Sequence, residues 1–217
     1  MTAHHHPSEE LLTAFATGLL DHGEHIVVAA HVAQCSECQA FVHAIEELAG
    51  ETLEEIAPAA MRSKELSDGA LSNADVKDIA TVPLVKSARS PASLNDLPAV
   101  LSNYELGPWK WLAPGVSLRP IILSGPSRSR AFILRSKPGT RMLEHTHSGV
   151  ELTHVISGEF AHEGGRFAAG DFDYGDETLH HQPVVGGGQP CVCLVAMTGE
   201  LEPNGLIGRL MKPFIRL

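Results

Sequence analysis

The stretch that decides the fold is Gly139-Thr-Arg-Met-Leu-Glu-His145-Thr-His147-Ser-Gly-Val-Glu151-Leu-Thr-His-Val-Ile-Ser-Gly158. His145, His147 and Glu151 are separated by even numbers of residues, so in extended chain their side chains project toward the same side. Two imidazoles and one carboxylate on one face are suitable ligands for a divalent metal. The alternative is a surface His-x-His pair on an ordinary strand. We favour the metal site, with a further ligand expected from elsewhere in the chain.

Segments typical of short strands surround this stretch after residue 98. One of them contains a Gly164-Gly165 turn and predicts a hairpin. Short strands separated by glycine turns favour an antiparallel barrel or jelly roll. The predicted strand segments are residues 116–123, 130–135, 158–167 and 191–197.

Cys191 and Cys193 alternate with apolar residues in the last of these segments, which places both thiols on one face of the strand. Cysteines in this setting are often small core residues. The second hypothesis is that they are sensing thiols close to a metal inside the barrel.

The first fifty residues show helical periodicity. Ser8 is a suitable N-cap, and apolar residues then recur at steps of three and four as far as Leu20. A second helical pattern leads into His31, and a third ends near Gly50. We therefore predict three helices before the strand-rich part of the chain.

His31, Cys35 and Cys38 lie between the second and third of these helices. On one continuous helix, His31 and Cys38 would be about 10 Å apart along the axis, at roughly 1.5 Å per residue. That distance is too long for two ligands of one tetrahedral ion. We therefore predict a helix break near Cys35, followed by a Ser36-x-x-Gln39 capping box that starts the next helix.

A tetrahedral zinc site needs a fourth ligand, and the His4-His5-His6 run just before the first helix offers one. We prefer His6, with His5 as the next candidate. Two thiolates and two imidazoles suit Zn²⁺, which in a small helical unit contributes on the order of 10 kcal/mol to folding. The alternative is a Cys-x-x-Cys redox motif, but no strand precedes it as in a thioredoxin-like unit.

The chain has 217 residues, of which 43% are hydrophobic, enough for one large or two small domains. Its formal net charge of −10, with 16 Lys and Arg, argues against direct binding to nucleic acid or to an anionic membrane. No apolar run approaches the roughly 18–20 residues that span a bilayer, and no signal pattern opens the sequence. We expect a soluble, cytoplasmic protein.

The stretch from Gly139 to Gly158 is similar to the first characteristic segment of cupins, because the glycines, both histidines and the glutamate keep that family's spacing. The stretch that runs from Gly170 to His181 resembles the second cupin segment, with the family's histidine at His181 rather than His180. The resemblance implies a barrel that binds a second divalent metal, zinc first, with iron or manganese as alternatives. The implied ligands are His145, His147, Glu151 and His181.

The order of the two halves, a His-x3-Cys-x2-Cys helical unit and then a cupin, resembles the ChrR-type zinc-binding anti-sigma factors. The likeness extends to the closing Leu206-Ile-Gly-Arg-Leu stretch. It implies that the N-terminal part binds and inhibits an extracytoplasmic-function sigma factor. The cupin would sense singlet oxygen or an organic hydroperoxide and so release the partner, without enzymatic turnover. The implied N-terminal zinc ligands are His6, His31, Cys35 and Cys38.

These observations predict an α+β chain of two domains. A zinc-binding helical domain spans residues 1–85, a linker spans 86–100, and a cupin-like sensor domain spans 101–217. Residues 73–79 predict a fourth helix ahead of the linker. The alternative function is a metal-dependent cupin enzyme, an oxygenase or isomerase, with the zinc unit as an interaction module. The other histidines are interpreted as surface or packing residues: His22, His25, His43, His154, His162 and His180.

Overall fold

The computed structural model describes residues 3–57 and 97–203. Contacts divide the chain into two compact units, one of Met1–Glu47 with Asp96–Leu217 and the other of Leu48–Asn95. The predicted fourth helix, most of the predicted linker and the closing stretch at Leu206 lie outside the described residues. The predicted domain boundaries therefore stay predictions.

The three predicted helices are present as α1 (Glu9–Ala16), α2 (His22–Val32) and α3 (Ser36–Glu54). Ser8 is the N-cap of α1, since its Oγ accepts a hydrogen bond from the backbone N–H of Leu11 at 3.2 Å. The first helix ends earlier than predicted, because Gly18 follows in a left-handed conformation with φ 71°. In the part of the chain that is described, no helix is long and apolar enough to cross a membrane.

The helix break near Cys35 is confirmed, since α2 ends at Val32 and α3 begins at Ser36. The predicted capping box is wrong. Ser36 is the first residue inside α3, and the Gln39 side-chain amide donates to the carbonyl of Val32 at 2.8 Å. Gln39 therefore ties the start of α3 to the last turn of α2, and it holds the two helices at the bend that brings the ligands together.

The rest of the described chain is antiparallel β-structure after a 3₁₀ helix at Ala99–Asn103. One sheet has the order β1-β3-β4-β11-β6-β9, with β2 paired to β3, and two small sheets are formed by β10-β7-β8 and β12-β5. The predicted α+β fold with an antiparallel barrel is confirmed. The strands are β1 Glu105–Leu106, β2 Lys110–Ala113, β3 Val116–Ile122, β4 Arg130–Ser136, β5 His145–His147, β6 Glu151–Ser157, β7 Glu159–His162, β8 Gly165–Ala168, β9 Phe172–Gly175, β10 Val184–Val185, β11 Cys191–Met197 and β12 Leu201–Pro203.

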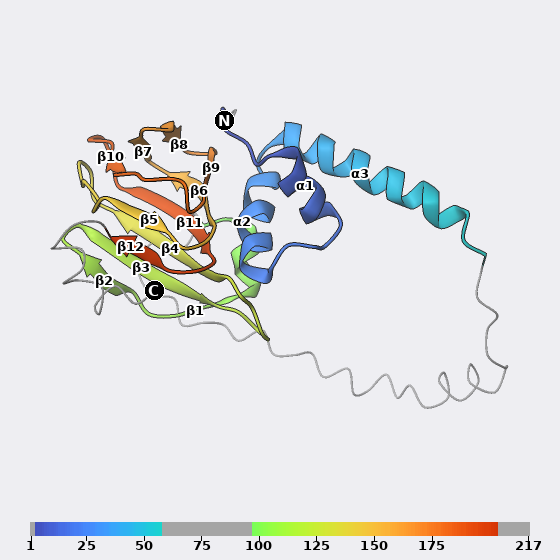
Figure 1. The fold of residues 1–217 in the computed structure, drawn as a ribbon, viewed down its shortest axis with the longest axis horizontal. Helices are drawn as coiled ribbons and strands as arrows, with labels where there is room; N and C mark the ends of the chain where they lie inside the picture. Colours follow the sequence, from blue (N-terminus) through green and yellow to red (C-terminus); the bar gives the residue numbers. More distant parts are fainter. Residues whose placement is uncertain (1–2, 58–96, 204–217) are drawn as a thin grey trace. The chain divides into compact units, whose positions relative to one another are not determined.

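Both faces of the large sheet are buried at β11, and this strand shows how the sequence divides between them. Leu194 and Ala196 belong to the cluster that includes the apolar residues of α2, whereas Cys193 and Val195 belong to the cluster inside the barrel. This alternation follows from the two-residue period of a strand. Helix α2 contacts β4, β6 and β11 along the outer face, as Figure 1 shows.

A carboxylate fixes the start of α2 to the loop before β4. The side chain of Asp21 accepts hydrogen bonds from the hydroxyls of Ser127 and Ser129 and from the backbone N–H groups of Arg128 and Ser129, the latter two at 3.1 Å. The N–H of Gly23 donates to Ser129 Oγ at 2.9 Å. A Cβ at Gly23 would lie 2.6 Å from that oxygen, so this close approach requires glycine.

Candidate metal centres

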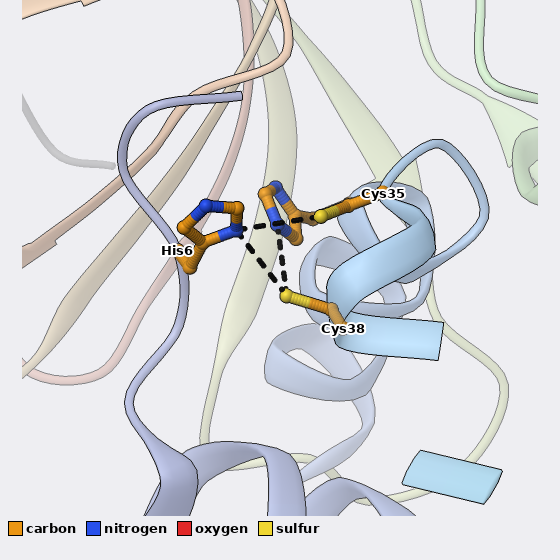
Figure 2. A group of neighbouring side chains, drawn as sticks. His6, Cys35 and Cys38 are labelled. Atoms are coloured by element: carbon orange, nitrogen blue, oxygen red, sulfur yellow. Dashed lines mark hydrogen bonds between the residues drawn. The ribbon is translucent and has the colours of Figure 1, made fainter. Parts of the chain in front are cut away.

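The N-terminal candidate centre consists of His6, His31, Cys35 and Cys38, whose ligand atoms all lie within 4.8 Å of one another. The His6 Nδ1 atom is 3.3 Å from Cys35 Sγ and 3.5 Å from Cys38 Sγ, as Figure 2 shows. The Nε2 atom of His31 is 3.3 Å from Cys38 Sγ. The structure therefore brings together all four residues that the sequence singled out.

These distances fit a tetrahedral zinc ion. Zinc–nitrogen bonds of about 2.0 Å and zinc–sulfur bonds of about 2.3 Å place neighbouring ligand atoms of a tetrahedron roughly 3.3–3.8 Å apart. The observed spacings fall in this range. Two thiolates and two imidazoles are also a donor set that zinc prefers.

The electrostatics of the buried pair His31 and Cys38 also favour a cation. Burial, with a smaller effect of His6, lowers the pKa of His31 to about 4, so the ring is neutral near pH 7 and can ligate through Nε2. Burial and the adjacent Cys35 thiol raise the pKa of Cys38 to about 12. A thiolate at this position therefore needs a positive charge beside it, and Zn²⁺ supplies one.

The four candidate ligands come from four local structures. His31 lies in the last turn of α2, Cys35 lies in the bend, and Cys38 lies in the first turn of α3. His6 comes from the extended segment before α1. The alternative ligand His5 is turned away, with its ring 4.5 Å from the ring of Phe167.

The second candidate centre lies inside the barrel and consists of His145, His147 and His181. His145 and His147 project from β5, and His181 is held beside them by two backbone hydrogen bonds with His145, at 3.0 and 3.1 Å. The Nε2 atom of His181 is 2.9 Å from that of His145 and 3.2 Å from that of His147. The shared parity predicted for His145 and His147 is thus observed.

The three Nε2 atoms are suited to a metal because they lie close together around one point. The Nδ1 atom of His145 donates to the carbonyl of Leu143 at 2.8 Å, which leaves its Nε2 as an acceptor. Burial lowers the pKa of His147 to about 4 and that of His181 to about 3, so both rings are neutral near pH 7. Neutral imidazoles are the form in which histidine binds a metal, so the three rings can act as ligands through Nε2.

Glu151, the predicted fourth ligand, lies outside this three-histidine group. One carboxylate oxygen is 3.7 Å from Nδ1 of His147, and the other accepts a hydrogen bond from Thr153 Oγ1 at 3.3 Å. Burial, with a further contribution from Asp173, raises the pKa of Glu151 to about 7. Its assignment as a metal ligand stays a prediction.

The barrel interior contains a further pair, His162 and Asp173, that sequence reasoning missed. The Nε2 atom of His162 donates to Asp173 Oδ2 at 2.9 Å, and the His162 ring is 4.9 Å from the ring of His181. His162 has the same parity on β7 as the buried Phe160, and Asp173 pairs in register with Thr153 of β6. Side chains alternate between the two faces of a strand, and this alternation could have predicted from the sequence that both side chains point into the barrel.

Cys191 and Cys193 also face the barrel interior, where both thiols are unoxidised and buried. Their sulfur atoms are 3.6 Å apart, and the hydrogen bond between them lowers the pKa of Cys191. The same bond, together with burial, raises the pKa of Cys193. Both residues line a cavity of about 40 Å³ that also reaches Asp173 and His181.

A larger cavity of about 280 Å³ leads to His145 and Glu151. Most of its lining side chains are apolar, including residues of β2, β3, β4 and β11. Arg141 is the one cation among the lining residues that the structure describes. This cavity suits a mainly apolar organic molecule better than a polar metabolite.

The fold and the two donor sets define a class of protein in which a helical zinc-finger unit is joined to a cupin barrel with a candidate metal centre. Comparison with family models agrees, since a zinc-finger family matches residues 8–39 and the family described as "ChrR Cupin-like domain" matches residues 99–201. The chain is 36% identical, over the full length of both proteins, to the anti-sigma-E factor ChrR of Cereibacter sphaeroides. The chain belongs to the ChrR family of anti-sigma factors.

A solved relative agrees in three dimensions. The structure is similar to a chain in the crystal structure of Rhodobacter sphaeroides SigE in complex with the anti-sigma ChrR, with 32% identity and a TM-score of 0.70. The match covers 91% of this chain and 99% of that one. These relatives are regulators, so the comparisons favour a regulatory protein over the cupin enzyme that the sequence left as an alternative.

Proposed function

We propose that this chain binds and inhibits an extracytoplasmic-function sigma factor through its N-terminal zinc-binding helices and releases it after an oxidative signal reaches the cupin barrel. The observation that carries the proposal is the complete two-thiol, two-imidazole donor set on the N-terminal helices, in a chain related over its full length to an anti-sigma factor. The partner acts with RNA polymerase, so the protein would function in the cytoplasm.

Exposed apolar side chains support partner binding by the helices. Leu48 and Leu53 of α3 are 61% and 66% exposed, and Ile56 just after the helix is 65% exposed. Large apolar residues repeated along one helix are typical of a surface that a partner covers. The formal net charge of −10 suits a partner with basic surfaces.

The barrel has features that suit an organic hydroperoxide as the signal. The 280 Å³ cavity would admit an apolar molecule and direct its polar end toward His145 and Glu151. A divalent metal held by His145, His147 and His181, zinc first, would act there as a Lewis acid. Singlet oxygen is the other oxidant that the family resemblance implies.

The thiol pair offers a balanced chemical step. The Cys191 thiolate attacks one oxygen of the hydroperoxide, the O–O bond breaks, and the alcohol leaves after taking a proton. Cys193 then attacks the resulting sulfenic acid and expels water, so that two thiols are oxidised and the hydroperoxide is reduced. Alternate residues of a strand are about 6.7 Å apart, close to the upper limit for a disulfide, so this bond would distort β11. Helix α2 packs on that strand.

The experiment that tests the proposal is co-expression with the candidate sigma factor, followed by size-exclusion chromatography and a transcription assay with and without this chain. The expected result is a co-eluting complex that silences transcription and loses inhibition after treatment with an organic hydroperoxide. Absence of both complex and inhibition would overturn the anti-sigma assignment. Inhibition that persists under every oxidant would overturn the sensing part alone.

A further inference from the structure

The segment that carries His6 is held by the turn between β8 and β9 of the cupin. The Asp171 side chain, in a residue only 2% exposed, accepts hydrogen bonds through Oδ1 from the backbone N–H groups of His4 at 2.6 Å and His5 at 3.2 Å. Its other oxygen accepts from the N–H of Ala168 at 2.8 Å, which fixes the carboxylate in place. Burial alone would raise the pKa of Asp171, but these three N–H donors lower it, so the group is ionised near pH 7.

The next residue of the cupin completes the attachment. The backbone N–H of Phe172 donates to the carbonyl of His5 at 3.0 Å. The ring of His5 rests on Phe167 of β8. His5 is therefore held through its N–H, its carbonyl and its ring. Because His6 is the next residue, these contacts restrict the position of its imidazole relative to Cys35 and Cys38.

The second imidazole of the zinc group is also held by cupin residues. The His31 ring makes edge contacts with Phe172 and His154, at centroid distances of 5.7 and 5.6 Å. Nδ1 of His31 has no hydrogen-bond partner among the described residues, so packing against these two rings holds its orientation. His31 and His154 are both fully buried, so neither ring can turn without displacing its neighbours.

Groups that hold metal ligands from outside the coordination sphere commonly change metal affinity by about 10–100-fold. From these contacts we propose that the cupin residues Asp171 and Phe172 are part of the N-terminal zinc site. Asp171 would be the positioning residue for His6, and Phe172, together with His154, would position His31. The zinc affinity of the inhibitory helices then depends on the cupin fold. This inference rests on the zinc site of the proposed function.

The test is a titration of the metal-free, full-length chain with Co²⁺. Binding is monitored by the thiolate-to-cobalt charge-transfer absorption. A Cys35→Ser variant gives the background from other sites. The informative variants are Asp171→Ala and the more conservative Asp171→Asn, which keeps one oxygen acceptor. The matched control is Asp176→Ala, because Asp176 also accepts a backbone hydrogen bond, from Thr178 at 2.9 Å, but at an exposed turn.

We expect Asp171→Ala to weaken Co²⁺ binding at the thiolate site by about 10-fold or more, Asp171→Asn to weaken it less, and Asp176→Ala to leave it unchanged. Cys38 alkylation, measured by mass spectrometry, should be fastest in Asp171→Ala, slower in Asp171→Asn, and as slow in Asp176→Ala as in the parent. Unchanged affinity in both Asp171 variants would overturn this inference and leave the proposed function standing. A charge-transfer band as strong in Cys35→Ser as in the parent would overturn the N-terminal zinc site, and the inference with it.

Discussion

His154 and Glu151 lie three residues apart on β6 and face opposite sides of the sheet. The ring of His154 contacts His31 of the N-terminal group, whereas Glu151 lines the barrel cavity beside His145. One strand therefore has one face against each candidate metal centre. Because close-packed sheets transmit displacements, a change inside the barrel would reach the candidate zinc ligand His31 through β6.

Substitution of either N-terminal thiol should abolish inhibition. Cys35→Ser or Cys38→Ser removes one of the two sulfur ligands, and structural zinc sites lose most of their folding energy when a ligand is lost. The measurement is bound zinc per chain and repression in the transcription assay. Cys193→Ser is a suitable control, because it removes a buried thiol from the barrel and should leave N-terminal zinc and repression intact. Full repression by the zinc-free Cys38→Ser chain would contradict the prediction.

Substitution of the predicted barrel ligands should have the opposite pattern. His145→Ala or Glu151→Ala leaves the N-terminal donor set intact, so repression should persist while the response to oxidant becomes weaker. The measurement is the oxidant concentration that restores half of the transcription. Outright loss of repression in these variants would contradict the assignment of repression to the N-terminal centre and of the oxidant response to the barrel centre.

The thiol pair should matter only for sensing. A Cys191→Ser/Cys193→Ser double variant keeps two small buried side chains but cannot form a disulfide across the 3.6 Å sulfur separation. We expect it to repress normally and to resist release by an organic hydroperoxide. Mass spectrometry of the parent chain should find a mass loss of two hydrogens on the peptide with both cysteines. A double variant that responds like the parent would exclude this pair as the sensor.

Local patterns predicted much of this arrangement. The even spacing of His145 and His147 identified the inner face of β5, and the distance between His31 and Cys38 required the helix break. Gln39 was predicted to complete a capping box, but its side chain instead donates to Val32. A glutamine can make either contact, so its presence does not distinguish them.

Contacts between distant segments could not be predicted in this way. The Asp171 carboxylate accepts a hydrogen bond from the backbone N–H of His4, 167 positions away. Nearly every residue has a backbone N–H, so the sequence does not show which one a carboxylate will bind. The pairing of His162 with Asp173 likewise depends on which strands are neighbours in the barrel. Both contacts are set by the topology of the sheets rather than by a local motif, which explains why a single sequence did not identify them.

The attachment of α2 through Asp21 should depend on pH. Burial alone would raise the pKa of Asp21, but hydrogen bonds from Ser127, Ser129 and the backbone hold it well below the usual range. A lowered folded-state pKa gives a contribution that is present above the unfolded value of about 3.9 and is lost as the pH falls further. Asp21→Asn should therefore lower the free energy of unfolding by about 1–2 kcal/mol at pH 7 and by less at pH 3.

The measurement is urea unfolding of the parent and of Asp21→Asn at pH 7, 5 and 3. Any zinc released at low pH is released from both chains, so the difference between them isolates the carboxylate. Ser127→Ala is a useful comparison, because it removes one donor and leaves the charge. A difference between parent and Asp21→Asn that stays constant across this range would show that the ionised carboxylate does not supply the stability.

Occupancy of the barrel site should change the stability of the N-terminal zinc site. Asp173 accepts the hydrogen bond of His162, whose ring lies beside His181, and Phe172, the preceding residue of β9, contacts His31. Two sites that bias one strand are thermodynamically coupled, typically by 5–150-fold. We expect Cys38 alkylation in the presence of a chelator to be about fivefold or more faster in His181→Ala than in the metal-loaded parent.

Asp173→Ala should reduce this coupling, because it removes the acceptor that ties His162 to β9. In each background, the Cys38 alkylation rate of the His181→Ala chain is divided by the rate of the metal-loaded chain that keeps His181. This ratio is then compared between the parent and the Asp173→Ala background. Asp176→Ala, on the exposed turn after β9, should keep the parent's ratio. Equal alkylation rates in the parent and in His181→Ala would mean that the two centres are independent, and the signal would then have to reach the helices by a route other than β9.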